Sequence, residues 1–337
     1  MIDLTTDYVG LKLKNPLVPS ASPLTRDLDT ALRLEDAGAA ALVMYSLFEE
    51  ELDAEAIMAD RFLLHGDLGH GEADGFLPDH GDFRSGLDHY LEQLRRLKER
   101  LEIPVVASLN GVSLSGWVSL GRELQEAGAD ALELNVYHVA ADADYSGEAV
   151  EARYLRLLGE LRAAVELPIV MKLSPYFSSL PHFVRQLERG GANGVALFNR
   201  FYQPDIDLDS LQVAHRLHLS QPHEALLRIV WIAILHGRTR LTLAATGGVH
   251  GAGEALKLLL AGADVVHLAS CLLEKGPERL GGILRDMGDW MEAREYASVA
   301  QLKGSMSQQN LPDPMVLARA NYLHVLDSFR PPPGVRS

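Results

Sequence analysis

Short apolar runs alternate with longer amphipathic stretches along the chain, and a recurring phrase marks the junctions between them. It reads DAGAAALVMY at 36–45, EAGADALELN at 126–135, RGGANGVALF at 189–198 and LAGADVVHLA at 260–269. A glycine that follows an amphipathic stretch suits the left-handed residue that closes a helix. A short, continuous apolar run is typical of a strand that is buried on both faces. Each copy therefore predicts the end of a helix and the start of a buried strand.

Four further apolar runs bring the number of predicted strands to eight. EIPVVASLN (102–110) and ELPIVMKLS (166–174) each contain a proline that stops the preceding helix, and LVPSA (17–21) and LTLAATG (241–247) complete the set. Helical patterns lie between the strands, at roughly 27–37, 86–101, 115–127, 148–165, 179–189, 223–236, 251–261 and 277–295. Strands that alternate strictly with helices are expected to be parallel and joined by right-handed crossovers.

Eight such units in 337 residues predict an α/β protein with a single (β/α)8 TIM barrel. The alternative is a doubly wound open sheet, but no GxGxxG phrase follows the first strand. We expect the barrel to span residues 1–310 and a C-terminal tail to span 311–337. Two segments, 47–85 after the second strand and 200–225 after the sixth, exceed ordinary loops and should form lids or substrate walls.

Composition narrows the range of partners and compartments. The chain has 46 acidic against 31 basic residues and a net charge of −15, which argues against a nucleic-acid groove. A single cysteine, Cys271, excludes an intrachain disulfide, a CxxC zinc site and an iron–sulfur cluster. The first twenty residues lack the order of a signal peptide, and no run reaches the roughly 18 apolar residues of a membrane span. We therefore expect a cytoplasmic protein without a membrane or nucleic-acid partner.

The first long segment, 47–85, is also a candidate metal site. It contains His65, His70 and His80 among acidic residues. Their irregular spacing in a Gly/Asp-rich stretch favours a solvated lid, so no metal is expected.

The seventh and eighth strands end in residues that suit a phosphate group. Gly247 and Gly248 follow the seventh strand, and Ala269 and Ser270 follow the eighth. In barrels of this kind the loops after these two strands form a recurring phosphate site from backbone N–H groups at a helix start. The alternative is that the glycines only turn the chain.

Polar residues also end several of the other strands. Lys172 interrupts the apolar run of the fifth strand, so it needs either an anionic ligand or an internal partner such as Glu133. Asn110, Asn135 and Asn199 end the third, fourth and sixth strands. Amides offer both donors and acceptors, which recognition of the edge of a heterocycle requires.

At these residues the chain resembles the dihydroorotate dehydrogenase family, particularly its soluble class 1 branch. The resemblance runs from about residue 3 to residue 307. It rests on the phrases Asn15-Pro16, Ser20-Ala21-Ser22, ELN at 133–135, KLSPYF at 172–177, TGG at 246–248 and EKGP at 274–277.

The resemblance implies an FMN-dependent oxidoreductase of pyrimidine metabolism that acts on CH–CH bonds and forms a homodimer. It implies that FMN lies at the C-terminal face of the barrel, with Lys172 near the N1/O2 edge of the flavin and the phosphate at the two loops named above. The residues implied to contact the flavin or the substrate are Ala21, Ser22, Tyr45, Ser46, Asn110, Asn135, Lys172, Asn199, Gly247, Gly248, Ala269 and Ser270. With no second nucleotide motif in the chain, electrons should pass to a small molecule or to another protein chain.

Three departures from the family pattern bear on the substrate and on the base. Tyr45 stands where the family has a lysine, and Ala140 stands where it has an asparagine. The position of the family's cysteine or serine base holds His138. Dihydroorotate carries a carboxylate that needs polar partners, so we expect a different small cyclic or unsaturated substrate.

His138 and Lys172 are the candidate catalytic residues. Imidazole accepts a proton near neutral pH, while a lysine beside the flavin would stabilise negative charge as hydride is accepted. His138 can equally be a solvated loop residue, with Tyr137 as an acid instead. Two other functions remain open: a flavin-free lyase or isomerase that binds a phosphorylated substrate, and a flavin-binding subunit without substrate turnover.

Overall fold

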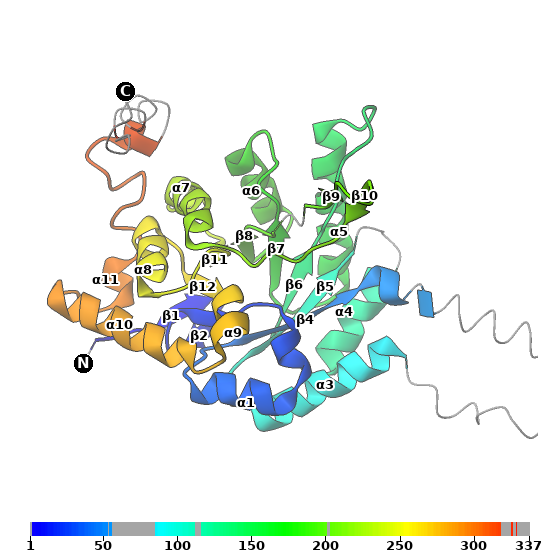
Figure 1. Cartoon of the computed structure of the whole chain (residues 1–337), viewed down its shortest axis with the longest axis horizontal. Helices are drawn as coiled ribbons and strands as arrows, with labels where there is room; N and C mark the ends of the chain where they lie inside the picture. The colour runs from blue at the N-terminus through cyan, green and yellow to red at the C-terminus, as the bar shows by residue number, and fades with distance from the viewer. Residues whose placement is uncertain are drawn as a thin grey trace, which may run out of the picture.

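Eight parallel strands form a nearly closed barrel, as the sequence predicts (Figure 1). The computed structural model describes residues 2–52, 54–55, 85–111, 116–200 and 203–317, with 325 and 328. The sheet order is β3-β12-β11-β8-β7-β6-β5-β4, and the backbone N–H of Ala40 donates to the Leu17 carbonyl (3.1 Å) where the two end strands meet. The barrel strands are β3 (Leu17–Pro19), β4 (Leu42–Phe48), β5 (Val105–Asn110), β6 (Ala131–Asn135), β7 (Ile169–Leu173), β8 (Gly194–Leu197), β11 (Thr242–Thr246) and β12 (Val265–Leu268).

Helices surround the barrel, and the bounds of eight of them lie within two residues of the predicted ones. These are α1 (Leu28–Asp36), α3 (Gly86–Arg100), α4 (Trp117–Glu126), α5 (Gly147–Ala164), α6 (Leu180–Arg189), α7 (Ala225–Leu235), α8 (Ala252–Ala261) and α10 (Arg279–Ala293). The glycines of the recurring phrase, at 38, 128, 191 and 262, have φ angles of 105°, 97°, 94° and 122°. The phrase therefore marks helix ends because this backbone conformation favours glycine.

The sequence pattern missed several short elements. They are the strands β1 (Thr6–Tyr8), β2 (Leu11–Leu13), β9 (Asp205–Asp207) and β10 (Gln212–Ala214), the helices α9 (Ser270–Lys275) and α11 (Val299–Leu302), and the 3-10 helices η1 (Pro23–Arg26), η2 (Pro222–Glu224) and η3 (Pro314–Leu317). The division into a barrel over 1–310 and a tail stays a prediction.

One buried apolar side chain from every strand fills the lower half of the barrel. The eight residues are Val18, Val43, Val106, Ala131, Val170, Ala196, Ala244 and Val265. Side chains that point inward recur every second residue along a strand. The next inward layer, toward the C-terminal ends of the strands, therefore contains Ser108, Glu133, Lys172, Thr246 and His267. This layer is polar, and it forms the floor of the mouth.

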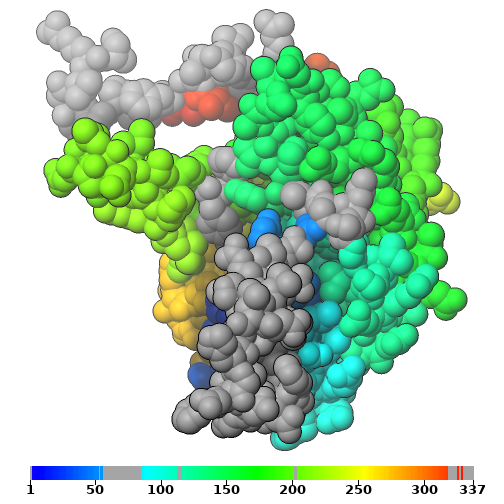
Figure 2. Space-filling model, turned by 90° about the vertical axis from the view of Figure 1, so that its right-hand side faces the viewer, coloured from blue at the N-terminus to red at the C-terminus, as the bar shows by residue number. Residues whose placement is uncertain are grey.

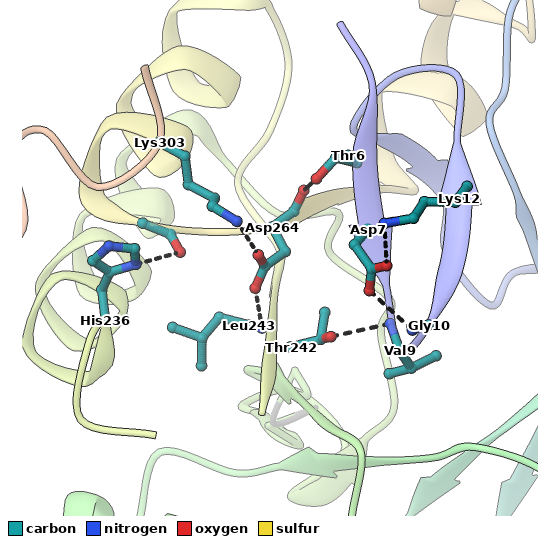
Figure 3. Close-up of polar contacts among 11 residues, drawn as sticks. Thr6, Asp7, Val9, Gly10, Lys12, His236, Thr242, Leu243, Asp264 and Lys303 are labelled. Carbon is teal, nitrogen blue, oxygen red and sulfur yellow. Dashed lines mark hydrogen bonds and ion pairs between the residues drawn. The ribbon is translucent and has the colours of Figure 1, made fainter. Parts of the chain in front are cut away.

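The β1–β2 hairpin packs against the end of the barrel opposite the mouth, and Figure 3 shows its polar contacts with the neighbouring residues of the barrel. Its Tyr8, Val9 and Leu13 pack against the lower apolar layer. The Val9 N–H donates to Thr242 Oγ1 (3.0 Å), which fixes the hairpin to β11. Asp264, just before β12, accepts from the Leu243 N–H (2.8 Å) and from Lys303 Nζ (2.6 Å). These contacts fix the hairpin across the end of the barrel that lies opposite the mouth.

The described parts of the two long segments follow the carboxyl ends of β4 and β8, the end of the barrel where the sequence places them. The first is described only in part, so its histidines at 65, 70 and 80 lie outside the described residues. The second carries the β9–β10 hairpin. Figure 2 shows a hollow between a lime-green lobe from the segment after β8 and a green lobe from the segment after β6. Among the helices of the described ranges, none is both long and apolar enough to span a bilayer.

Candidate active site at the barrel mouth

Eight of the predicted cofactor-binding residues line a single cavity at the mouth. They come from the ends of β3, β7, β8, β11 and β12, and are Ala21, Ser22, Lys172, Asn199, Gly247, Gly248, Ala269 and Ser270. The same cavity is lined by Arg228, Ser220 and His267. Residues that are distant in the sequence meet here because the carboxyl ends of all parallel strands open on one face.

One end of this cavity has the donors that a phosphate needs. Helix α9 begins at Ser270, so its first N–H groups have no carbonyl partner within the helix. Gly247 and Gly248 have φ angles of 98° and 79°. A Cβ on Gly248 would lie 2.5 Å from the Ala225 nitrogen, so this glycine also permits close packing against the start of α7. Ser270 Oγ accepts from the Ser220 N–H (3.0 Å), which ties the segment after β8 to this site.

Arg228 is a site residue that the sequence reasoning missed. It lies on α7, only 6% of its surface is exposed, and its Nε and Nη1 donate to the carbonyls of Thr246 (2.9 Å) and Glu224 (2.8 Å). Its Nη2 lies 2.9 Å from the position that a Cβ on Gly247 would take. Within the described chain no carboxylate approaches this guanidinium within 4.0 Å, and burial lowers its pKa. A buried cation without a carboxylate partner favours an anionic ligand.

The sequence carried a signal for Arg228: it interrupts the apolar helix ALLRIVWIAIL at 225–235, much as Lys172 interrupts β7. The apolar residues on both sides of Arg228 instead predict an ordinary packed helix.

Lys172 combines the two environments that the sequence left open, an internal ion pair and a ligand-binding cavity. Its Nζ lies 3.1 Å from Glu133 Oε1, and both side chains are nearly or fully buried. It also lines the mouth cavity, so the internal ion pair leaves it accessible to a ligand. Glu133 Oε2 has no hydrogen-bond partner in the described chain, so the carboxylate depends on Lys172 and on Ser108 Oγ, which donates to Oε1 (3.5 Å).

His267 lies beside this ion pair at the floor of the cavity. Its Nδ1 is 3.9 Å from Glu133 Oε2, and burial is the main cause that lowers its pKa to about 4. The ring is therefore neutral at pH 7. Neither ring nitrogen has a hydrogen-bond partner among the described residues. The upper layer thus offers unsatisfied polar atoms directly below the cavity.

The side chains of Tyr45 and Ser46 point in different directions, although the two residues are neighbours on β4. The β4–β5 register shifts between Val43 and Ser46, so Ser46 points into the barrel and its Oγ lies 2.9 Å from Ser108 Oγ. Tyr45 instead contacts Tyr90 edge-on and lines a separate cavity beside Arg26. The structure therefore does not bring Tyr45 to the Lys172 cavity.

The predicted asparagines occupy the rim. Asn110 and Asn135 are register partners at the ends of β5 and β6. Asn199 Nδ2 donates to Asn135 Oδ1 (2.8 Å), which joins two of the three predicted amides in one pair. Asn110 is half-buried and does not line the Lys172 cavity among the described residues.

His138 lies on the loop after β6 and lines a second cavity beside the first. Asn199 lines both cavities, so they are adjacent at this residue. The His138 ring contacts Tyr145 edge-on, and its Nε2 is buried without a hydrogen-bond partner in the described chain. Burial, followed by the charge of Arg153, lowers the pKa of His138 from 6.5. The imidazole is therefore neutral at pH 7 and able to accept a proton.

Comparisons with known proteins agree on one family. The family model described as dihydroorotate dehydrogenase matches residues 71–291. The chain is 25% identical over 316 residues to the dihydroorotate dehydrogenase B (NAD(+)) catalytic subunit of Thermoplasma acidophilum, covering 90% of this chain and 99% of that protein. It is 26% identical over 282 residues to the dihydroorotate dehydrogenase A (fumarate) of Lactobacillus delbrueckii subsp. bulgaricus, covering 81% and 89% of the two chains. The resemblance predicted from the sequence is confirmed.

Proposed function

Because this chain belongs to the dihydroorotate dehydrogenase family of flavin-dependent oxidoreductases that act on CH–CH bonds, we propose that it binds FMN at the barrel mouth. The observation that carries the proposal is the single cavity that joins a phosphate-type loop pair, a buried arginine and Lys172. Gly247, Gly248, Ala269 and Ser270 would hold the phosphate. Ala21, Ser22, Ser46, Asn135 and Lys172 would lie toward the isoalloxazine ring.

When bound, FMN supplies the acceptor for a hydride removed from a small cyclic or unsaturated substrate. Lys172 contributes a positive charge at one edge of the site, where negative charge develops as hydride is accepted. Glu133 holds the Lys172 ammonium in place from below through the 3.1 Å ion pair. Such preorganised charge lowers the barrier because it needs no reorientation during the reaction.

His138 would act as the general base in this proposal. It is the neutral titratable side chain whose unpartnered Nε2 belongs to the cavity beside Asn199. It would accept a proton from the substrate carbon adjacent to the one that loses hydride. Asn135 and Asn199, already paired with each other, would orient the substrate at the junction of the two cavities.

The electron acceptor and the oligomeric state are also proposed from membership of the family. The relative in Thermoplasma acidophilum is a catalytic subunit, so a second protein chain can take the electrons, as can a small molecule. We also propose a homodimer, which sedimentation of the purified protein would test.

Dihydroorotate should be a poor substrate. Tyr45 points away from the Lys172 cavity and Ala140 offers no side-chain amide, so polar groups that the substrate needs are missing. Each unmet polar group costs about 1–3 kcal/mol in a desolvated site, and two losses reduce turnover by roughly 30- to 10⁴-fold. Anaerobic stopped-flow absorbance of the FMN-loaded protein measures this. Flavin reduction by dihydroorotate at many turnovers per second would contradict the expectation.

Replacing Arg228 by glutamine should weaken FMN binding about 10- to 100-fold while leaving riboflavin binding nearly unchanged. A hydrogen bond to a charged group contributes about 1.5–3 kcal/mol, and riboflavin lacks the phosphate that would receive it. Fluorescence titration of the apoprotein gives both dissociation constants. Arg216→Gln is the control, since that side chain is 65% exposed and ion-paired with Asp207. An equal weakening of FMN binding and riboflavin binding would mean that Arg228 only ties α7 to β11.

A further inference from the structure

The cavity beside the flavin site has a composition that bears on the substrate. It lies between the loop after β6, the first turns of α5 and the loop after β7. Its lining includes Val136, Tyr137, Tyr145, Tyr154, Tyr176 and Phe177, and most of the other lining residues are small or apolar. Most of these side chains are aromatic or aliphatic, which suits a flat ring.

Charge in this lining is sparse and of one sign. No lysine or arginine belongs to it in the described ranges, and Glu151 is its acidic residue. Outside the lining, the guanidinium of Arg153 lies over the Tyr145 ring, 5.7 Å from its centroid. A carboxylate placed in this cavity would be desolvated beside an acid and without a cation in the lining, which is costly.

The cavity nevertheless has polar groups for a neutral ligand. His138 Nε2 is buried and has no partner among the described residues. Asn199 Nδ2 is committed to Asn135, which leaves its Oδ1 as an acceptor toward the junction with the flavin cavity. A ring that carries an N–H or C=O group can satisfy these atoms, and unsatisfied buried polar atoms favour such a partner.

We propose that this cavity holds the substrate, and that the substrate is an uncharged ring that becomes planar when it is oxidised and carries at least one hydrogen-bonding group. The proposal rests on the proposed hydride transfer to FMN and adds the substrate class to it. Tyr176, 66% exposed at the rim, covers one face of the ring, and His138 contacts its edge. The carboxylate of dihydroorotate is disfavoured because no lysine or arginine of the described residues lines the cavity to pair with it.

The test compares two ligands that differ in one group. Orotate carries a carboxylate where 6-methyluracil carries a methyl group. We expect 6-methyluracil to bind the FMN-loaded protein roughly 10- to 100-fold more tightly than orotate, because only orotate must bury an unpaired charge. Dissociation constants come from the change in the visible flavin spectrum and, independently, from calorimetry.

Variants of the lining sharpen the test. Glu151→Lys adds a cation to the cavity, so it should shift the preference toward orotate by at least about 10-fold. Glu148→Lys is the matched control on the exposed surface of the same helix. Tyr176→Ala should weaken the binding of 6-methyluracil about 3- to 10-fold, because an aromatic contact is lost, and should leave the FMN content unchanged.

Orotate binding as tight as that of 6-methyluracil would overturn the proposed substrate class. So would no measurable binding of 6-methyluracil, or binding that neither Glu151→Lys nor Tyr176→Ala alters. A protein that takes up no flavin would refute the proposed function separately, since calorimetry still reports which ring the cavity binds.

Discussion

Replacing His138 by asparagine should slow flavin reduction by the physiological substrate about 10²- to 10⁴-fold. Asparagine keeps a polar side chain of similar size but cannot accept the proton at neutral pH. The pKa of His138 lies below 6.5 because the ring is partly buried and near Arg153. The wild-type rate should therefore be constant around pH 7 and fall only at a pH below the 6.5 of an ordinary imidazole, as the ring becomes protonated and no longer accepts a proton.

The pH profile separates a base from a structural residue. His138→Asn should abolish the acidic limb while FMN affinity stays nearly unchanged. His182→Asn, on the exposed face of α6, is the control and should alter neither the rate nor the profile. An unchanged rate for His138→Asn would remove the histidine from the mechanism. Parallel loss of FMN and activity would make it structural.

Replacing Lys172 by methionine should lower the free energy of unfolding by about 3–5 kcal/mol. The substitution leaves the Glu133 carboxylate fully buried beside the neutral His267 ring, and its Oε2 already lacks a hydrogen bond among the described residues. Urea denaturation of the apoprotein measures the change without any contribution from bound flavin. In the FMN-loaded protein, flavin reduction should also be slower because the positive charge is gone.

A double variant distinguishes the two roles of Lys172. Lys172→Met combined with Glu133→Gln removes both charges, so much of the lost stability should return while flavin reduction stays slow. Lys12→Met is the control, because the Lys12–Asp7 pair is exposed and should contribute less than about 1 kcal/mol. Full recovery of flavin reduction in the double variant would show that Lys172 only neutralises Glu133.

The repeated unit made the barrel predictable. Each copy of the phrase ends a helix at a glycine with positive φ and continues into a strand that is buried on both faces. These are local requirements of backbone conformation and burial, so one sequence reveals them. For the same reason the period of two along β6 and β7 placed Glu133 and Lys172 in one layer inside the barrel.

Features that depend on distant contacts could not be predicted in this way. The β1–β2 hairpin has strands of three residues and is held by side chains such as Thr242. The register shift that separates Tyr45 from Ser46 arises from the pairing of β4 with β5. Arg228 reaches the mouth because α7 packs against β11, a relationship that the apolar pattern of the helix does not encode.

The most direct test of the central claim is the visible absorption spectrum of the protein incubated with FMN and then freed of unbound cofactor. We expect a flavin spectrum, perturbed from that of free FMN, with one FMN released per chain on denaturation. Retention should depend on the phosphate, so riboflavin should be lost on the same column. A colourless protein that retains no FMN would contradict the account.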